Sequence, residues 1–271
     1  MNPERPMIGW LDAPREWLDA FGEIARFGTR IAGIVLSGRV FRFFGEGLRQ
    51  AGILIFGSAL IIWAFIFILG LQCGIQGAYF NRSVGAPSLA GLFSSYCDLR
   101  EGIPYAFGYI LAAKVGTGIV AELGAMRISD EIDALEVMGI EPVTFLAATR
   151  LLGAWIALPF LYLVGIGVAY LASYIAVVQQ VGDVSSGGYL LIFWKFQSPP
   201  DLFFSLVKGM VMATIIVLVG CYYGYTASGG PIGVGTATAK SMVVNIILVH
   251  IIGMLGTLIF WGSNPRAPIG G

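Results

Sequence analysis

The stretch that decides the fold is LAAKVGTGIVAELGAMRISDEIDALEVMGIEP, residues 111–142, where an apolar chain becomes acidic and then apolar again. Its acidic part contains a single basic residue, Arg127, and six carboxylates: Glu122, Asp130, Glu131, Asp133, Glu136 and Glu141. The apolar runs on either side are long enough to cross a bilayer, which takes about 20 residues. The pattern therefore predicts an aqueous segment between two membrane spans.

A short helix over residues 128–139 is predicted inside this segment. Ser129 or Asp130 can cap its N-terminus, and Gly139 followed by Pro142 ends it. The acids of its first turn are favourable to the helix dipole, and Ile128, Ile132 and Leu135 share one face. Such a helix is too short to span the membrane, so it should lie on the membrane surface. Two interpretations remain: a helix whose acids only keep it in water, or a helix that docks on a partner.

Composition identifies the class of protein, because 57% of the residues are hydrophobic and only 12% are charged. These values are typical of an integral membrane protein. The formal net charge is zero, so charge gives no case for binding nucleic acid. With one histidine and three cysteines without CxxC spacing, we predict no catalytic residues, metal site or cofactor. Cys73 and Cys97 could fall on the same side of the membrane, and a disulfide between them is left open.

The predicted architecture is an all-α membrane protein with one domain over residues 1–271 and five spans. An amphipathic helix within residues 10–45 should lie on the membrane, although packing on a soluble partner gives the same pattern. The predicted spans cover residues 50–71, 105–122, 143–178, 202–225 and 243–261. Seven of the sixteen Lys and Arg residues precede the first span, which places the N-terminus in the cytoplasm. The acidic segment is then cytoplasmic, while segments 72–104 and 179–201 and the C-terminus lie outside.

Charges inside or beside the spans are costly and are therefore candidates for function: Arg100, Glu101, Lys114 and Glu122. They either form structural ion pairs or, for Arg100 and Glu101, meet a lipid head group or a partner, while Lys114 and Glu122 support the acidic helix. His250 is predicted to be a helix-contact histidine rather than a proton carrier. The glycines of 116–121 and 229–235 lack the context of a nucleotide site, and Gly220 and Gly224 predict close helix packing.

The run KVGTGIVAELGAMRISDEIDALEVMGIEP also resembles the signature of the MlaE/YrbE family, the permease subunits of ABC transporters that move lipids with MCE-domain proteins. The preceding LREGIPYAFGYILAAKVG is similar to the actinobacterial Mce-operon branch, with Arg100 and Glu101 followed by Gly-Ile-Pro. The resemblance implies a cytoplasmic coupling helix that docks on a separate ATPase. The residues that it assigns to coupling are Glu122, Arg127, Asp130, Glu131, Asp133 and Glu136.

The same resemblance implies a lipid site bordered by Arg100, Glu101, Phe67, Leu71 and Gln72. It implies no catalysis by this chain, a second identical or paralogous permease, MCE-domain partners outside, and import of fatty-acid-like or sterol-like lipids across the cell membrane. Two alternatives remain. One is an ion-coupled secondary transporter that uses Glu101, Lys114 and Glu122 as a relay, and the other is a membrane anchor that transports nothing.

Overall fold

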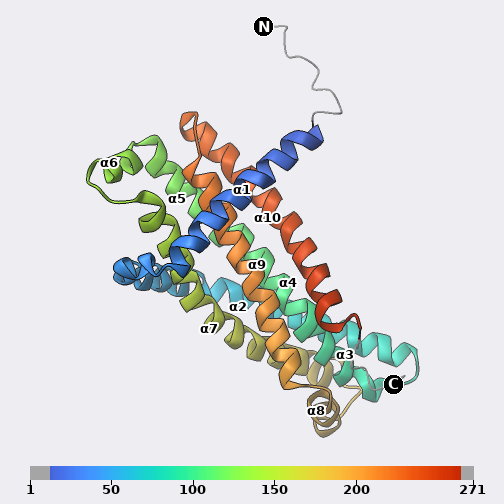
Figure 1. Ribbon diagram of the computed structural model, residues 1–271. Coiled ribbons are helices and arrows are strands. Elements are labelled where there is room, and N and C mark those ends of the chain that lie inside the picture. Colours follow the sequence, from blue (N-terminus) through green and yellow to red (C-terminus); the bar gives the residue numbers. More distant parts are fainter. Residues whose placement is uncertain (1–12, 264–271) are drawn as a thin grey trace.

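The computed structural model describes residues 13–263, and within them the chain forms helices and connecting turns without a strand. This confirms the predicted all-α class (Figure 1). Within residues 13–263, five helical stretches are long and apolar enough to cross a membrane: Arg39–Ser83, Pro87–Ile128, Val143–Val181, Pro199–Tyr225 and Gly230–Trp261. Each contains one of the spans predicted from the sequence.

The described helices follow one another with few residues between them. The first half of the chain contains α1 (Ala13–Leu36), η1 (Arg39–Phe43), α2 (Phe44–Ser83), η2 (Pro87–Leu89), α3 (Ala90–Tyr96), η3 (Cys97–Gly102), α4 (Ile103–Ile110), η4 (Leu111–Gly116), α5 (Thr117–Ile128) and α6 (Glu131–Val137). The second half contains η5 (Val143–Ala148), α7 (Thr149–Tyr174), η6 (Ile175–Val181), α8 (Ser186–Lys195), α9 (Pro199–Tyr225) and α10 (Gly230–Trp261).

Several helices extend beyond the predicted spans. The first span was predicted to end at residue 71, but α2 continues to Ser83. The second was predicted to start at residue 105, but Pro104 lies in the first turn of α4, which follows the π-helical turn η3 without a break. The last was predicted to start at residue 243, after the glycines of 229–235. Only Gly229 and Gly230 have positive φ, 86° and 69°, and α10 begins there with Pro231 in its first turn.

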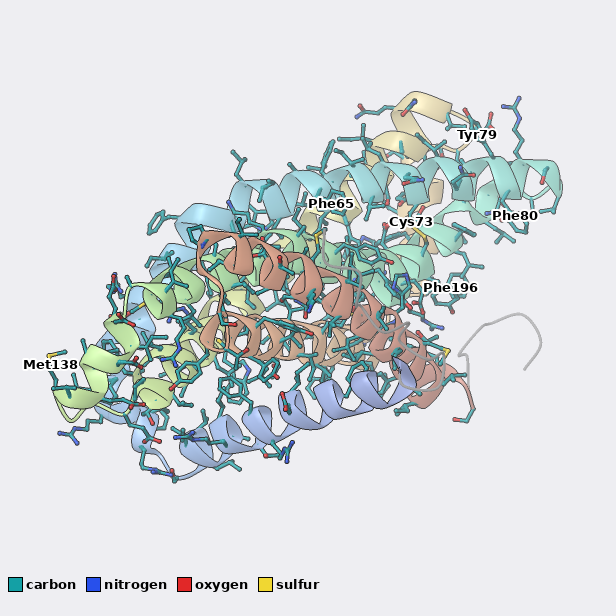
Figure 2. All side chains as sticks on the ribbon, turned by 90° about the horizontal axis from the view of Figure 1, so that it is seen from above. Phe65, Cys73, Tyr79, Phe80, Met138 and Phe196 are labelled. Atoms are coloured by element: carbon teal, nitrogen blue, oxygen red, sulfur yellow. A yellow bond between two sulfur atoms is a disulfide. The ribbon has the colours of Figure 1, made fainter. Side chains whose placement is uncertain are left out.

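The helices form one elongated bundle in which α6 lies at one end and α3 and α8 lie at the other (Figure 1). Figure 2 shows the same separation, with Met138 at the tip near α6 and Cys73 and Phe196 toward the opposite end. We call these the α6 end and the α3 end. The disulfide that the sequence left open is present: Cys73 of α2 is bonded to Cys97 of η3 at the α3 end.

The first helix, α1, crosses the outside of the bundle rather than joining it (Figure 1). Its Ile31 and Ile34 are buried, and the Phe27 ring lies 5.9 Å from that of Tyr222 and 6.0 Å from that of Tyr225, both in α9. The amphipathic pattern therefore has a structural basis, because the apolar face of α1 packs on the bundle. That α1 lies in the membrane surface stays a prediction.

Small residues let the spans approach closely. A Cβ atom added to Gly70 would lie 2.6 Å from the Ala169 backbone oxygen, so α2 and α7 touch through their backbones. On the other side, a Cβ atom at Gly220 would lie 3.0 Å from Gly116 O, and one at Gly224 would lie 2.7 Å from Leu123 Cβ. These contacts between α9 and the second span confirm the packing role predicted for Gly220 and Gly224.

Candidate functional site

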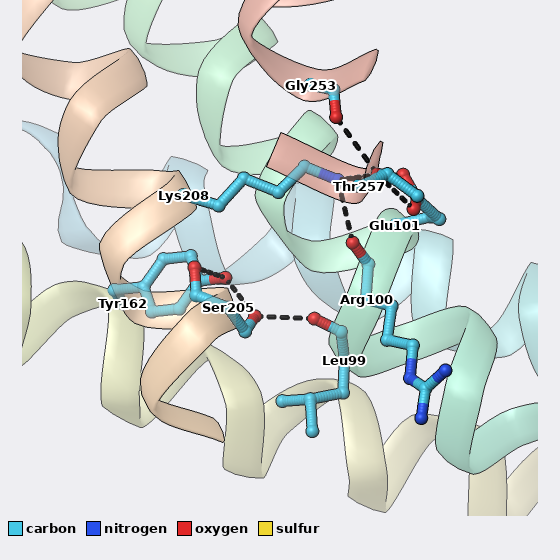
Figure 3. A network of polar contacts seen from close by, with 8 residues as sticks. All are labelled: Leu99, Arg100, Glu101, Tyr162, Ser205, Lys208, Gly253 and Thr257. Atoms are coloured by element: carbon cyan, nitrogen blue, oxygen red, sulfur yellow. Dashed lines mark hydrogen bonds and ion pairs between the residues drawn. The ribbon is translucent and has the colours of Figure 1, made fainter. Parts of the chain in front are cut away.

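The α3 end holds a group of interacting polar side chains that we call the α3-end network: Arg100, Glu101, Asp201, Lys208, Thr257 and Trp261. Figure 3 shows four of them, Arg100, Glu101, Lys208 and Thr257. At its centre, Lys208 Nζ donates to Glu101 Oε2 at 2.9 Å, to the Arg100 carbonyl oxygen at 2.9 Å and to Thr257 Oγ1 at 2.8 Å. The Lys208 side chain is 0% exposed, whereas that of Glu101 is 41% exposed. The ammonium group is thus fully occupied inside the protein, and its carboxylate partner reaches the surface.

Thr257 of α10 completes this arrangement. Its Oγ1 lies 2.6 Å from Glu101 Oε1 and 2.9 Å from the Gly253 carbonyl oxygen. Glu101 therefore has a polar partner on each carboxylate oxygen, one from α9 and one from α10. A carboxylate held in this way is fixed in position and still accessible to a ligand.

The side chain of Arg100 points away from Lys208 (Figure 3). It forms a second ion pair, with Asp201. Its Nη2 donates to Asp201 Oδ2 at 3.0 Å, and the two side chains are only 11% and 3% exposed. Trp261 Nε1 donates to Asp201 Oδ1 at 2.8 Å, and the guanidinium carbon lies 3.9 Å from the centre of the Tyr96 ring. Arg100 is thus enclosed by an acid and an aromatic ring, which favours a structural role for its charge.

Hydrogen bonds from hydroxyl groups hold the backbone next to the α3-end network in place. The Tyr162 and Ser205 hydroxyls lie 2.6 Å apart, and Ser205 also donates to the carbonyl oxygen of Leu99, the residue before Arg100 (Figure 3). On the α2 side, Ser173 bonds to the Asp98 carboxyl group and to the Gly70 carbonyl oxygen. Through these bonds α2, α7 and α9 together hold the π-helical turn that carries Arg100 and Glu101.

The α6 end presents charge in the opposite manner, at the surface. Helix α6 spans only Glu131–Val137, shorter than the predicted 128–139. Asp130 occupies the N-cap position with φ 58°, but its side chain makes no capping bond. At the other end Gly139 has φ 76°, and the Ile140 N–H donates to Leu135 O, so a Schellman turn ends the helix as Gly139 predicted.

One apolar face anchors α6 while its acids stay outside. Ile132 is fully buried and Leu135 packs on the core, as predicted, but Ile128 is 38% exposed. Asp133 pairs with Arg127 of α5 at 2.5 Å, and Glu131 accepts a bond from Ser129. Asp130, Glu131, Asp133 and Glu136 are all exposed. These acids are thus available to a partner.

Two apolar residues at the end of α6 were missed by the sequence analysis. Val137 is 89% exposed and Met138 is 65% exposed, directly beside the acids. Met138 forms the tip of this end in Figure 2. An exposed apolar pair with an acidic rim is the usual composition of a protein-binding surface.

The turn after α6 fastens α1 to the bundle. Glu141 accepts a bond from Thr144 at 2.8 Å and an ion pair from Arg30 of α1 at 3.2 Å. The Thr144 hydrogen bond, together with Arg30 and Arg39, lowers the pKa of Glu141 below its ordinary value. This acid therefore serves the contact between α1 and η5, which no sequence pattern indicated.

Glu122 and Lys114 do not support α6 as expected, because neither makes a hydrogen bond or ion pair with it in the described structure. Glu122 Oε1 pairs with Arg150 Nη2 of α7 at 2.8 Å. Lys114 lies eight residues earlier and faces a cavity discussed below.

The residues predicted to border a lipid lie toward the α3 end, but no hydrogen bond or ion pair within the described residues joins those of α2 to Arg100 or Glu101. Phe67 and Leu71 are half-buried on α2 and Gln72 is exposed. Cys73, next to Gln72, is bonded to Cys97, which lies three residues before Arg100. The structure thus brings this part of α2 to the α3-end network, and its contact with lipid stays a prediction.

The sequence analysis missed several buried charged residues of the described structure, among them Asp201, Lys208 and Arg150. Asp201 lies directly before the predicted span 202–225, whereas Lys208 and Arg150 lie inside predicted spans. Both lie inside apolar spans, where a charge is costly and marks a site, so the same rule that selected Lys114 would have found them. His250 lies 3.0 Å from the Tyr109 hydroxyl and 2.8 Å from the Ile246 carbonyl oxygen, as expected of a helix-contact histidine. Residues 13–263 contain no group of His, Cys, Asp and Glu arranged to hold a metal ion.

The sequence is similar to that of known membrane permeases. The family model described as Permease MlaE matches residues 48–259. A probable ABC transporter permease protein of Rickettsia prowazekii is 33% identical over 215 residues, 79% of this chain and 82% of that protein. A probable ABC transporter permease protein of Synechocystis is 27% identical over 89% of this chain and 94% of that protein. The chloroplastic protein TRIGALACTOSYLDIACYLGLYCEROL 1 of Arabidopsis thaliana is 29% identical over 80% of this chain and 60% of that protein. The chain therefore belongs to the MlaE permease family.

Proposed function

We propose that this chain is the permease subunit of an ATP-driven lipid transporter, working in a pair with an identical or paralogous permease. Its family and its relatives named as ABC transporter permeases support this role. The name of the Arabidopsis relative refers to a glycolipid, which fits a lipid substrate class. ATP hydrolysis then occurs on a separate subunit, and this chain converts it into movement of its helices.

The observation that carries the proposal is α6. It is a seven-residue helix that buries Ile132 and turns its acids and the Val137–Met138 pair outward. A helix that is anchored on one face by Ile132 and Leu135 and exposed on its other faces fits a groove on a partner. We propose that this partner is the ATPase and that its groove is basic. Asp130, Glu131, Asp133 and Glu136 then contact it, while Arg127 holds α6 through Asp133 and Glu122 holds α5 against α7.

This role places the α6 end in the cytoplasm and the α3 end outside. The arginine-rich N-terminal segment supports that orientation by the positive-inside rule. The Cys73–Cys97 disulfide supports it independently, because disulfides persist in oxidising compartments rather than in the cytosol. The membrane is then the cell membrane, with the N-terminus cytoplasmic and the C-terminus extracytoplasmic.

At the α3 end, we propose that the accessible carboxylate of Glu101 and the neighbouring face of α2 meet the lipid that is exchanged with MCE-domain proteins. Phe67, Leu71 and Gln72 supply the apolar and polar border of that site, and Arg100 shapes it through Asp201. The resemblance to the actinobacterial branch favours import of a fatty-acid-like or sterol-like lipid.

The two rival functions are less well supported by the geometry. A relay through Glu101, Lys114 and Glu122 requires continuous polar contacts, but Glu101 bonds to Lys208 and Thr257, and Glu122 bonds to Arg150. An inert anchor has no use for an exposed acidic helix at one end and a buried ion-pair network at the other.

The test reverses two acids of α6 that lack an ion pair in the described structure, Glu131→Lys together with Glu136→Lys. Like charges then face the basic groove, so the variant should insert and pair normally but lose the copurifying ATPase and lipid-stimulated hydrolysis. The readouts are the subunit ratio after purification and the hydrolysis rate in nanodiscs.

The matched control is Asp183→Lys, which reverses an exposed acid at the α3 end. It should retain the ATPase. If the double variant copurifies ATPase and transports lipid like the natural protein, the coupling role of α6 is wrong and the anchor function gains.

A further inference from the structure

A cavity in the α6 half of the bundle is separate from the α3-end network. Its volume is about 250 Å³, and α2, the second span, α7 and α9 contribute to its wall. Its polar lining consists of Gln50, Ser58, Lys114, Glu122 and Arg150. Pockets for drug-sized ligands have about 300–1,000 Å³, so this one is large enough for a head group but not for a whole lipid.

The charge of this cavity is not balanced. Lys114 and Arg150 carry one positive charge each and Glu122 carries one negative charge, which leaves a net charge of +1. Arg150 donates to Glu122 and to the Leu146 carbonyl oxygen, but its Nε is buried without a hydrogen-bond partner. Nearby Glu46 and Arg49 neutralise each other at 2.8 Å. The cavity therefore favours an anion.

Lys114 is the residue that needs an explanation. No hydrogen bond or ion pair joins its Nζ to any residue that the structure describes, and the residue is exposed. It lies fourteen residues before the end of α5, about 21 Å along the helix at 1.5 Å per residue. An unpaired ammonium group at that depth in a bilayer costs about 3 kcal/mol.

The cavity also has an opening toward the surface of the bundle. Ile53, which lines it, is 53% exposed, and Gly118 has no atom within 4 Å of the position of a Cβ. A chain attached to a bound head group can thus remain on the apolar outer face of α2. The half-exposed Glu122 borders the opening and repels a second anion.

We infer that this cavity binds the acidic head group of a lipid, a phosphodiester or a carboxylate, at a second position along the permease. Lys114 contacts the anion, and Arg150 supplies a fixed positive charge behind it. This inference rests on the proposed function, because only a lipid in transit places a head group at this depth. It adds a binding site that neither the acidic helix nor the α3-end network contains.

The test measures where lipids bind, without ATP or transport. Ile53→Cys at the opening carries a bimane fluorophore; Cys221 is buried and Cys73 and Cys97 are bonded, so labelling is selective. The full-length protein, with the subunits that copurify, is placed in phosphatidylcholine nanodiscs. Phosphatidylglycerol with brominated chains, a brominated fatty acid and brominated phosphatidylcholine are then compared as quenchers.

Both acidic lipids should quench more than brominated phosphatidylcholine. Lys114→Gln should remove this excess, and Lys114→Arg should keep it and show that the site is still folded. Lys240→Gln removes an exposed lysine of α10 that lies outside this cavity, and it should leave the excess unchanged. Inorganic phosphate should not compete.

Equal quenching by acidic and neutral lipids, or an excess that persists in Lys114→Gln, overturns the inference. Displacement by inorganic phosphate also overturns it, because the site then takes a soluble anion. Failure of the proposed function is a separate result, since it is measured as ATPase copurification and hydrolysis in protein that retains Lys114.

Discussion

The two ends of this molecule hold charge in opposite ways. At the α3 end, Lys208 is 0% exposed and Asp201 is 3% exposed, and each has its partner within 3.0 Å. At the α6 end, Arg127 and Asp133 pair while 37% and 57% exposed. Buried charges depend on their protein partners, whereas exposed charges are stabilised by water. The α3 end is therefore fixed by its charges, and the α6 end keeps its charges available for another subunit.

The largest effect that this comparison predicts is that of Asp201→Asn. The substitution keeps the shape of the side chain but removes the carboxylate that pairs with the buried Arg100. Breaking a buried pair in this way costs about 3–5 kcal/mol, so the thermal midpoint of the purified protein should fall strongly. Adding Arg100→Met should recover part of the loss, because the buried guanidinium that paired with Asp201 is then gone as well.

The control for this prediction is another acid at the same end. Asp183 pairs with Arg82 at 3.5 Å, with side chains that are 28% and 64% exposed. Asp183→Asn should cost less than about 1 kcal/mol. If Asp201→Asn and Asp183→Asn have similar thermal midpoints, burial does not make an ion pair at this end more important for stability. The contrast between buried and exposed charges is then wrong.

Sequence reasoning predicted the spans and the acidic helix because both depend on local patterns. An apolar run of sufficient length and an acidic segment ended by Gly139 can be identified without knowing what packs on them. The Lys208–Glu101 pair joins residues that are 107 positions apart, and Arg150 and Glu122 meet across two helices. Such partners follow from helix packing, which no local pattern specifies. The last span was predicted to start at residue 243, whereas α10 starts at Gly230, because a membrane helix can continue through glycine and proline outside the most apolar run.

The second prediction compares two glycines of α2, one toward each end of the bundle. It tests whether α2 is packed more tightly at the α3 end than at the α6 end. A Cβ atom at Gly74 would lie 2.9 Å from Ser173 O and 2.9 Å from Ala176 Cβ, beside the disulfide at the α3 end. Gly74→Ala forces backbones apart and should cost about 1–3 kcal/mol. Gly52, toward the α6 end, has no atom within 4 Å of the same position. Gly52→Ala should raise stability by about 0.5–1 kcal/mol, because glycine is unfavourable inside a helix.

The measurement is the pair of thermal midpoints under identical conditions. Opposite signs support a tightly packed α3 half of α2 and a looser α6 half. A loss of similar size in both variants would show that α2 is packed to the same density along its length.

The smallest predicted effect concerns the ion pair that holds α1 at the α6 end. The Thr144 hydrogen bond and Arg30 lower the pKa of Glu141 below its ordinary value of 4.5. A group with a lowered folded-state pKa stabilises the fold above its unfolded pKa, and this contribution is lost as the pH falls through the folded pKa. Hydrogen exchange of α1 amides, corrected for intrinsic rates, should therefore show constant protection above about pH 5 and declining protection below the ordinary pKa.

Glu141→Gln should abolish this pH dependence and lower protection of α1 at neutral pH by no more than about fivefold, because Glu141 is 40% exposed and an exposed pair contributes up to about 1 kcal/mol. Asp133→Asn breaks the Arg127 pair on α6 instead and should leave α1 unchanged. Protection that rises as the pH falls would contradict the sign. Protection that declines equally in Glu141→Gln would assign the pH dependence to another group and leave α1 held by its apolar face and its other contacts with α9.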